Sequence, residues 1–148
     1  MAYDRSLTVP AVLDSLEPVT AFVECLAAEA GLDMRKAYQL RLAVEELLTN
    51  IIEHGYGPAR ADGQVVIEGD AGNHQVRIRL TDTAARFDPV HAPDPTDLDR
   101  PLRERTVGSL GLYLARRSVD RLSYEYIDGA NRTTVVVAAA PAARAGLS

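Results

Sequence analysis

Three polar side chains recur at every fourth position within the longest helical pattern of the sequence. Glu46, Asn50 and His54 are spaced i, i+4 and i+8, which places them in one row on a helix. Such a row can bind a metal ion or support a nucleophile. The alternative is a solvated face stabilised by ion pairs, although the positions three and four residues from Glu46 carry no cation. The spacing alone supports the two interpretations about equally.

Asp82 comes at the end of an alternating strand pattern, Gln75–Thr81, and is followed by Thr83-Ala84-Ala85-Arg86-Phe87-Asp88-Pro89. A carboxylate at the exit of a strand can accept a hydrogen bond from an exocyclic amine such as that of adenine. The alternative is an aspartate that forms a turn by accepting a hydrogen bond from its own backbone. Asp82 is therefore a candidate base-reading residue.

Two glycines open the third helical pattern of the chain, in Gly108-Ser109-Leu110-Gly111. Free backbone N–H groups at the start of a helix form a site for anions. Arg100, Arg103 and Arg105 come just before it, where guanidinium groups can reach phosphate oxygens. The alternative for the arginines is a solvated run of charge balanced by nearby aspartates.

Regular patterns in the rest of the sequence predict the elements that must position these side chains. The order of strand, helix, helix, two strands, loop, helix and two strands implies helices covering one face of a mostly antiparallel sheet. The expected ranges are strands at 7–9, 64–69, 75–81, 122–127 and 132–138, helices at 14–30, 33–55 and 108–120, turns at 70–73 and 128–129, and a long proline-containing loop at 88–106.

Composition narrows the class of protein. The chain has 148 residues, 47% of them hydrophobic, which predicts one domain over residues 1–148 with a flexible tail at 138–148. The net charge of −5 argues against direct binding of nucleic acid. Asp4 and Arg5 interrupt any signal sequence, and no apolar run is long enough to span a membrane, so a cytoplasmic protein is expected. Lys36, the only lysine, has no glycine loop beside it, which excludes a P-loop.

Taken together and in order, these motifs resemble a known arrangement. Residues 43–56 (AVEELLTNIIEHGY) resemble the N box of the GHKL ATPases, and residues 82–89 (DTAARFDP) resemble the D-x-G-x-x-F-D-P box of that superfamily. Residues 108–111 are similar to its second glycine box and residues 124–134 to its closing hairpin. Within the superfamily, the likeness is to the anti-sigma-factor serine kinases, and it covers roughly residues 7–137.

The resemblance implies a two-layer α/β sandwich of the Bergerat type, with a mostly antiparallel mixed sheet covered on one face by three helices. Mg-ATP would bind between the second helix and the segment 88–107. Asn50 would coordinate Mg²⁺, Glu46 would take the proton from an acceptor serine, and Asp82 would read adenine. The other nucleotide-binding residues that it implies are His54, Ala84, Phe87, Arg105, Gly108, Ser109, Leu110, Gly111 and Thr133.

The resemblance also implies the function of an anti-sigma factor that phosphorylates an anti-anti-sigma (STAS) antagonist, binds a sigma factor and forms a homodimer through the edge of the sheet near the N-terminal strand. One position departs from the pattern, because Ala84 stands where the superfamily has glycine. Glycine adopts positive φ at no cost and lets the backbone approach a base, so the Ala84 methyl is expected to weaken binding. The alternative function is a binding module that sequesters a regulator, with nucleotide structural or absent.

Overall fold

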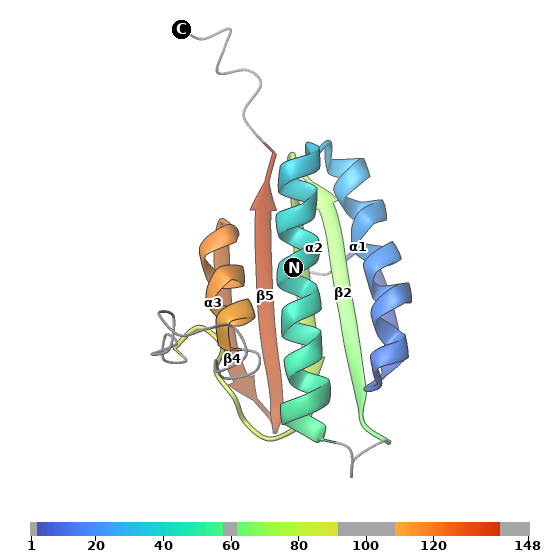
Figure 1. Cartoon of the computed structure of the whole chain (residues 1–148). Helices are drawn as coiled ribbons and strands as arrows, with labels where there is room; N and C mark the ends of the chain where they lie inside the picture. Colours follow the sequence, from blue (N-terminus) through green and yellow to red (C-terminus); the bar gives the residue numbers. More distant parts are fainter. Residues whose placement is uncertain (1–2, 58–61, 92–108, 140–148) are drawn as a thin grey trace, which may run out of the picture.

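A five-stranded sheet forms one layer of the protein in the computed structural model, which describes residues 3–57, 62–91 and 109–139 (Figure 1). The strand order is β1-β2-β3-β5-β4, and every described pairing is antiparallel. The expectation of a mixed sheet is therefore wrong, whereas the sandwich itself is confirmed. The strands are β1 (Arg5–Pro10), β2 (Gln64–Gly72), β3 (Gln75–Asp82), β4 (Arg121–Ile127) and β5 (Ala130–Ala138).

Three helices cover one face of this sheet, as Figure 1 shows: α1 (Leu16–Ala30), α2 (Met34–Asn50) and α3 (Ser109–Ser118). Alternate residues of the central strands point toward the helices, because successive side chains of a strand lie on opposite faces. The inward set is apolar and at most 1% exposed: Val65, Ile67, Val76, Ile78, Leu80, Val135 and Val137. The core therefore lies between the sheet and the helices.

The first helix does not begin at Asp14, the start of the expected range 14–30. A short 3₁₀-helix, η1 (Leu13–Ser15), precedes α1, and Ser15 at its end donates a hydroxyl hydrogen bond to the Pro10 carbonyl at 2.6 Å. Asp33 caps the second helix, because its side chain accepts a hydrogen bond from the Lys36 N–H at 2.8 Å.

Two-residue turns close both hairpins. Asp128 and Gly129 have φ of 53° and 78°, as the predicted turn at 128–129 requires. In the first hairpin the turn is Asn73-His74, with φ of 55° and 59°, rather than the predicted 70–73. The strand continues through Gly72, and an ion pair between Asp70 and Arg77 at 2.6 Å lies across the two strands.

The second helix changes type before it ends. The single α-helix expected up to Gly55 is wrong past Asn50, because residues Ile51–Tyr56 form a π-helix, η2. The π-helix uses i→i+5 hydrogen bonds and so has more residues in each turn than the α-helix. Side chains beyond Asn50 therefore leave the row that α-helical spacing defines.

The C-terminal end of the fold differs slightly from the predicted tail at 138–148. Ala138 is paired with Gln75 in the sheet, and the Ala139 N–H donates to the His74 carbonyl at 2.7 Å. The rest of the predicted tail, residues 140–148, lies outside the described residues. No helix in the described part of the chain is long and apolar enough to cross a membrane.

Two glycines of β2 provide a test of the packing between α1 and the sheet. A methyl group on Gly69 would lie 2.6 Å from Leu26 Cδ1 and 2.9 Å from Ile78 Cδ1, both in the closed core, whereas one on Gly72 would meet nothing within 4 Å. We predict that Gly69→Ala lowers the free energy of unfolding by about 1–3 kcal/mol, as overpacked cores do. Gly72→Ala is the matched control, with little effect. Urea unfolding measures both, and equal effects would contradict this packing.

Candidate active site

Asp82, the last residue of β3, is a buried carboxylate with one oxygen left available. It is 5% exposed, and its Oδ1 accepts hydrogen bonds from the Ala84 N–H and from Asn131 Nδ2, each at 2.9 Å. Its Oδ2 accepts none from the described residues, and it is not sealed from solvent. The bond to Ala84 is the turn that the alternative interpretation expected. The turn interpretation therefore holds for Oδ1, whereas base reading by Oδ2 stays a prediction.

Burial is the main influence on the ionisation of Asp82. It raises the pKa of this carboxyl above its usual value, while the hydrogen bonds from Asn131 and the Ala84 N–H act in the opposite direction. The two donors therefore favour the ionised form in a place where desolvation opposes it.

Thr133 lies beside Asp82 on the helix-covered face of the sheet. In the pairing of β3 with β5, Asp82 is opposite Asn131 and Leu80 is opposite Thr133, so that Thr133 is the diagonal neighbour of Asp82. Thr133 is 5% exposed. The predicted pair of Asp82 and Thr133 is thus brought together in a small polar region at the end of an apolar layer.

Ala84 does not have the backbone conformation for which glycine would be required. It is absent from the residues with positive φ in the described chain, and it is buried. Its methyl group lies 3.0 Å from the position that a Cβ on Gly55 of η2 would occupy. The methyl group therefore fills space left by Gly55, and the expected need for positive φ at this position is wrong.

Glu46 reaches across from α2 to α3. A Cβ on Gly111 would overlap the Glu46 carboxylate, so that the carboxylate can take this position only while residue 111 is glycine. Glu46 is half-buried and has no hydrogen bond or ion pair with any described residue. Burial, followed by repulsion from Glu45 and Glu53, raises the pKa of its carboxyl. A carboxylate with a raised pKa and no partner is suited to accept a proton.

Asn50 ends α2 one turn after Glu46. Its amide makes no hydrogen bond with the described residues, and it does not cap the following π-helix. A free amide oxygen is a ligand that Mg²⁺ accepts, and Mg²⁺ in nucleotide sites usually takes one or two protein ligands together with phosphate oxygens. The chemistry of Asn50 therefore fits the predicted metal ligand.

The π-helix separates His54 from this pair. His54 is exposed on η2, and it does not extend the row of Glu46 and Asn50. The same segment ends at Tyr56, whose hydroxyl donates to the Gln64 carbonyl at 2.8 Å and accepts from the Thr83 N–H at 2.9 Å. The end of the helix is thus attached to the residue that follows Asp82, and the role of His54 stays a prediction.

The other predicted residues are placed in part or not at all. Phe87 is 48% exposed, with its N–H directed to Asn131 Oδ1 at 3.2 Å. Ser109 and Leu110 are the first residues of α3, and their side chains are outside what the structure describes. Arg105 and Gly108 lie outside the described residues altogether. Their assignments remain predictions.

The sequence indicated Asn131 only as part of the closing hairpin, yet its side chain is central to the site. It is 4% exposed and contacts Asp82, Ala84, Phe87 and Tyr124. Asparagine is uncommon in strands, and Asn131 occupies an inward position two residues before Thr133. An amide at an inward position of the last strand was the signal available in the sequence.

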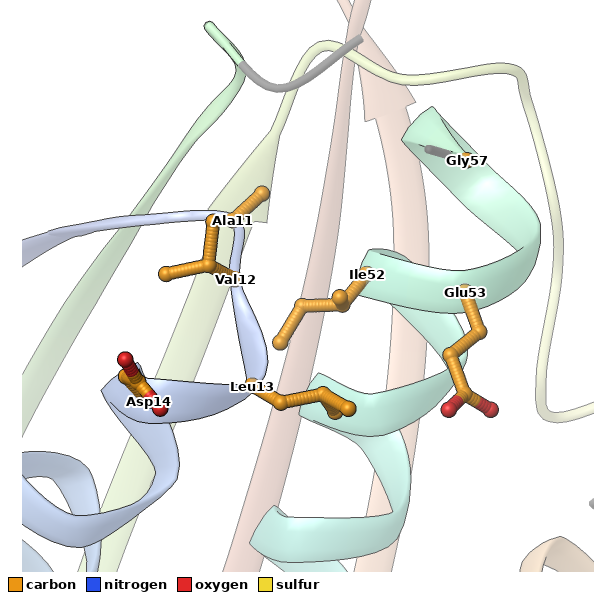
Figure 2. A pocket seen from close by; sticks show the side chains of 7 residues that line it. All are labelled: Ala11, Val12, Leu13, Asp14, Ile52, Glu53 and Gly57. Atoms are coloured by element: carbon orange, nitrogen blue, oxygen red, sulfur yellow. The ribbon is translucent and has the colours of Figure 1, made fainter. Parts of the chain in front are cut away.

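A pocket of about 460 Å³, separate from the predicted nucleotide site, lies between η2 and the connection from β1 to α1 (Figure 2). One wall comes from the connection between β1 and α1 and the other from η2, and none of the predicted nucleotide-site residues line it. The lining residues are Ala11, Val12, Leu13, Asp14, Ile52, Glu53 and Gly57.

Comparison with known proteins identifies the class of this fold and site. Residues 9–139 match the family described as the histidine kinase-like ATPase domain, and the chain belongs to this family. It is similar to the serine/threonine-protein kinase BtrW of Bordetella bronchiseptica, with 29% identity over 138 residues that cover 93% of each chain. It is also similar to the serine-protein kinase RsbW of Listeria monocytogenes, with 25% identity covering 70% of this chain and 68% of that one.

Solved structures confirm the fold. The RsbU and RsbW domains of a Mycobacterium tuberculosis protein superpose with a TM-score of 0.60 at 20% identity, over 90% of this chain and 32% of that one. This chain therefore spans about a third of that structure. The histidine kinase domain of a blue-light activated kinase from Erythrobacter litoralis gives a TM-score of 0.50 at 18% identity, over 88% of this chain and 61% of the other.

The raised pKa of Asp82 predicts how stability depends on pH. Below the pKa of the unfolded state, about 3.9, Asp82 is protonated in both states. As the pH rises through the higher folded-state pKa, the folded protein loses stability because it must ionise a buried group. Asp82→Asn lacks this loss. Urea unfolding from pH 4 to 8 should show the variant gaining stability relative to the parent as the pH rises. If the difference in free energy of unfolding between variant and parent stays constant or falls, the pKa of Asp82 is not raised in the folded protein.

Proposed function

We propose that the chain binds Mg-ATP and transfers the γ-phosphoryl group to a serine or threonine of a partner protein. The observation that carries this proposal is Glu46, a half-buried carboxylate without a partner among the described residues, placed against Gly111 and one helical turn before Asn50. A structural glutamate in that position would have an ion pair or hydrogen bond to offset its burial. A general base needs a carboxylate oxygen that is free to accept the proton.

Each residue of the site has a distinct part in this chemistry. Asp82 Oδ2 accepts the hydrogen bond of the adenine amine, while its Oδ1 stays bound to Ala84 and Asn131. The Asn50 amide oxygen would hold Mg²⁺, which would neutralise charge on the phosphates. Glu46 takes the proton of the incoming hydroxyl group as the hydroxyl oxygen attacks the γ-phosphorus, and ADP leaves with the electron pair of the broken P–O bond. The protein supplies position, charge neutralisation and a base.

The partner is proposed to be an anti-anti-sigma (STAS) protein, with a sigma factor as the second ligand, in a cytoplasmic switch that does not contact nucleic acid directly. The support is the resemblance to anti-sigma-factor kinases and the names of the similar proteins, BtrW and RsbW, which are given as serine or serine/threonine kinases. The acceptor would be a hydroxyl on the surface of the STAS partner.

A binding module is the second candidate. It would use the same fold to hold a regulator, and the transfer chemistry would be lost. Ala84 in place of glycine would permit it, but the Ala84 methyl is buried beside Gly55 and residue 84 does not have positive φ, so the conformational argument for lost nucleotide binding does not apply. Transfer to a partner therefore remains the first proposal.

Substitution of Glu46 separates catalysis from binding. Glu46→Gln removes the base but keeps the shape, so we predict that phosphorylation of a STAS partner falls roughly 10²- to 10⁴-fold while ATP affinity stays within a few-fold. Asn50→Ala should instead weaken Mg-ATP binding itself. Mass spectrometry of the partner and calorimetry with Mg-ATP measure the two effects.

Glu53→Gln is the matched control, because Glu53 raises the pKa of Glu46 without lying in the site. Its rate should stay within a few-fold of the parent, and the acidic limb of the pH profile should move to lower pH. Unchanged phosphorylation by Glu46→Gln would show that Glu46 is not the base. A parent protein that binds a sigma factor and never phosphorylates a STAS partner would favour the binding module.

Homodimer formation through the sheet edge is a further part of the proposal. β1 is an edge strand, since it pairs with β2 alone among the described strands, and we expect a second copy to pair with its other side. Sedimentation at tens of micromolar should give twice the chain mass of 16.0 kDa. Thr8→Lys, on the exposed face of β1, should shift the protein toward the monomer. A parent that sediments as a monomer would contradict this proposal.

A further inference from the structure

We propose that Asn131 is the residue that sets base selectivity: its amide holds Asp82 so that Oδ2 remains an acceptor, which takes the amine of adenine and rejects the carbonyl of hypoxanthine or guanine. This inference rests on the proposed nucleotide site. Asn131 would not touch the nucleotide in this role. It is a positioning residue that acts through Asp82.

The Asn131 amide is bonded at both of its ends. Nδ2 donates to Asp82 Oδ1 at 2.9 Å and lies 3.2 Å from the carbonyl oxygens of Ala84 and Ala85. Oδ1 accepts from the Tyr124 hydroxyl at 2.5 Å and from the Phe87 N–H at 3.2 Å. The hydrogen-bonding capacity of this buried amide is thus used completely.

These partners fix the direction of the amide. A flipped side chain would place Nδ2 against the Phe87 N–H and Oδ1 against the Asp82 carboxylate, so that donors would face donors and acceptors would face acceptors. Since a buried polar group without a partner is costly, the flipped arrangement is excluded. Asp82 Oδ1 therefore always meets a donor.

The hydrogen bond from Asn131 Nδ2 influences whether Asp82 Oδ2 accepts a hydrogen bond from a base or donates one to it. As a carboxylate, Oδ2 can only accept, and adenine presents an amine there. As a carboxylic acid, Oδ2 can donate, and it would then accept a nucleotide whose base carries a carbonyl at the same place. Burial favours the acid, and a hydrogen bond from Asn131 favours the carboxylate.

Other groups around Asp82 do not replace this effect. Within the described chain, Asp82 has only the Ala84 N–H and Asn131 Nδ2 as hydrogen-bond donors. Arg86 and Asp88 act on the Tyr124 hydroxyl, which lies on the far side of the amide. Asn131 is therefore the one side chain among the described residues that donates to the base-reading carboxylate.

The test compares ATP with inosine triphosphate, whose base differs at the position read by Asp82. Calorimetry from pH 5.5 to 8.5, with Mg²⁺, gives the ratio of the two affinities, in which titration of the phosphates cancels. The parent should prefer ATP and lose that preference on acidification. In Asn131→Ala the pH at which the preference is half lost should rise by about one unit or more, because a hydrogen bond to a charged group is removed.

Recovery at high pH distinguishes positioning from simple loss of structure. Asn131→Ala should regain ATP preference once Asp82 ionises, which a collapsed site would not do. Tyr124→Phe is the matched control: it removes a partner from the opposite end of the same amide, and its midpoint should move less than half as far. Asn131→Val, a β-branched residue suited to a strand and without a hydrogen-bond donor, serves in the same way if Asn131→Ala does not fold.

The outcomes separate this inference from the function on which it rests. A parent that binds neither nucleotide would overturn the proposed function and the inference together. An Asn131 variant with the parent's pH dependence, or one that lacks ATP preference even at pH 8.5, would overturn the inference alone.

Discussion

The rest of the site depends on the hydrogen bonds that stabilise the buried carboxylate of Asp82. A charge at the end of β3 is stable only if donors surround it, and the structure supplies them from its own loop, through the Ala84 N–H, and from β5, through Asn131. Asn131 in turn connects the site to Tyr124 and Phe87. One cluster of hydrogen-bonded polar groups thus holds the end of β3, β5 and the loop after β3 together.

The part of the site on the helices depends on a different constraint, which is how closely neighbouring elements pack against one another. Gly111 leaves room for the Glu46 carboxylate between α2 and α3, and Gly55 leaves room for the Ala84 methyl between η2 and the loop after β3. The change from α2 to a π-helix at Ile51 lets Tyr56 reach Gln64 and Thr83. π-helical turns are often found at functional sites, and here the turn joins the helix to the loop beyond Asp82.

Much of this could be predicted from local patterns. Alternation defined the strand that ends at Asp82, and Asp33 marked the start of α2, because both signals depend on neighbours in sequence. The π-helix, the contact of Gly55 with Ala84 and the hydrogen bonds of Asn131 depend on residues far apart in the chain. Periodicity carries no information on such contacts, so the residues that hold the candidate site in place could not be predicted from the sequence.

A crystal structure with Mg²⁺ and a non-hydrolysable ATP analogue is the most direct test of the account. We expect the adenine amine within hydrogen-bond distance of Asp82 Oδ2, the Asn131 amide still bonded to Oδ1, and Mg²⁺ on the Asn50 oxygen. A base that binds elsewhere, or an Asp82 Oδ2 that faces only water while nucleotide is bound, would contradict the central claim that this buried carboxylate reads the nucleotide.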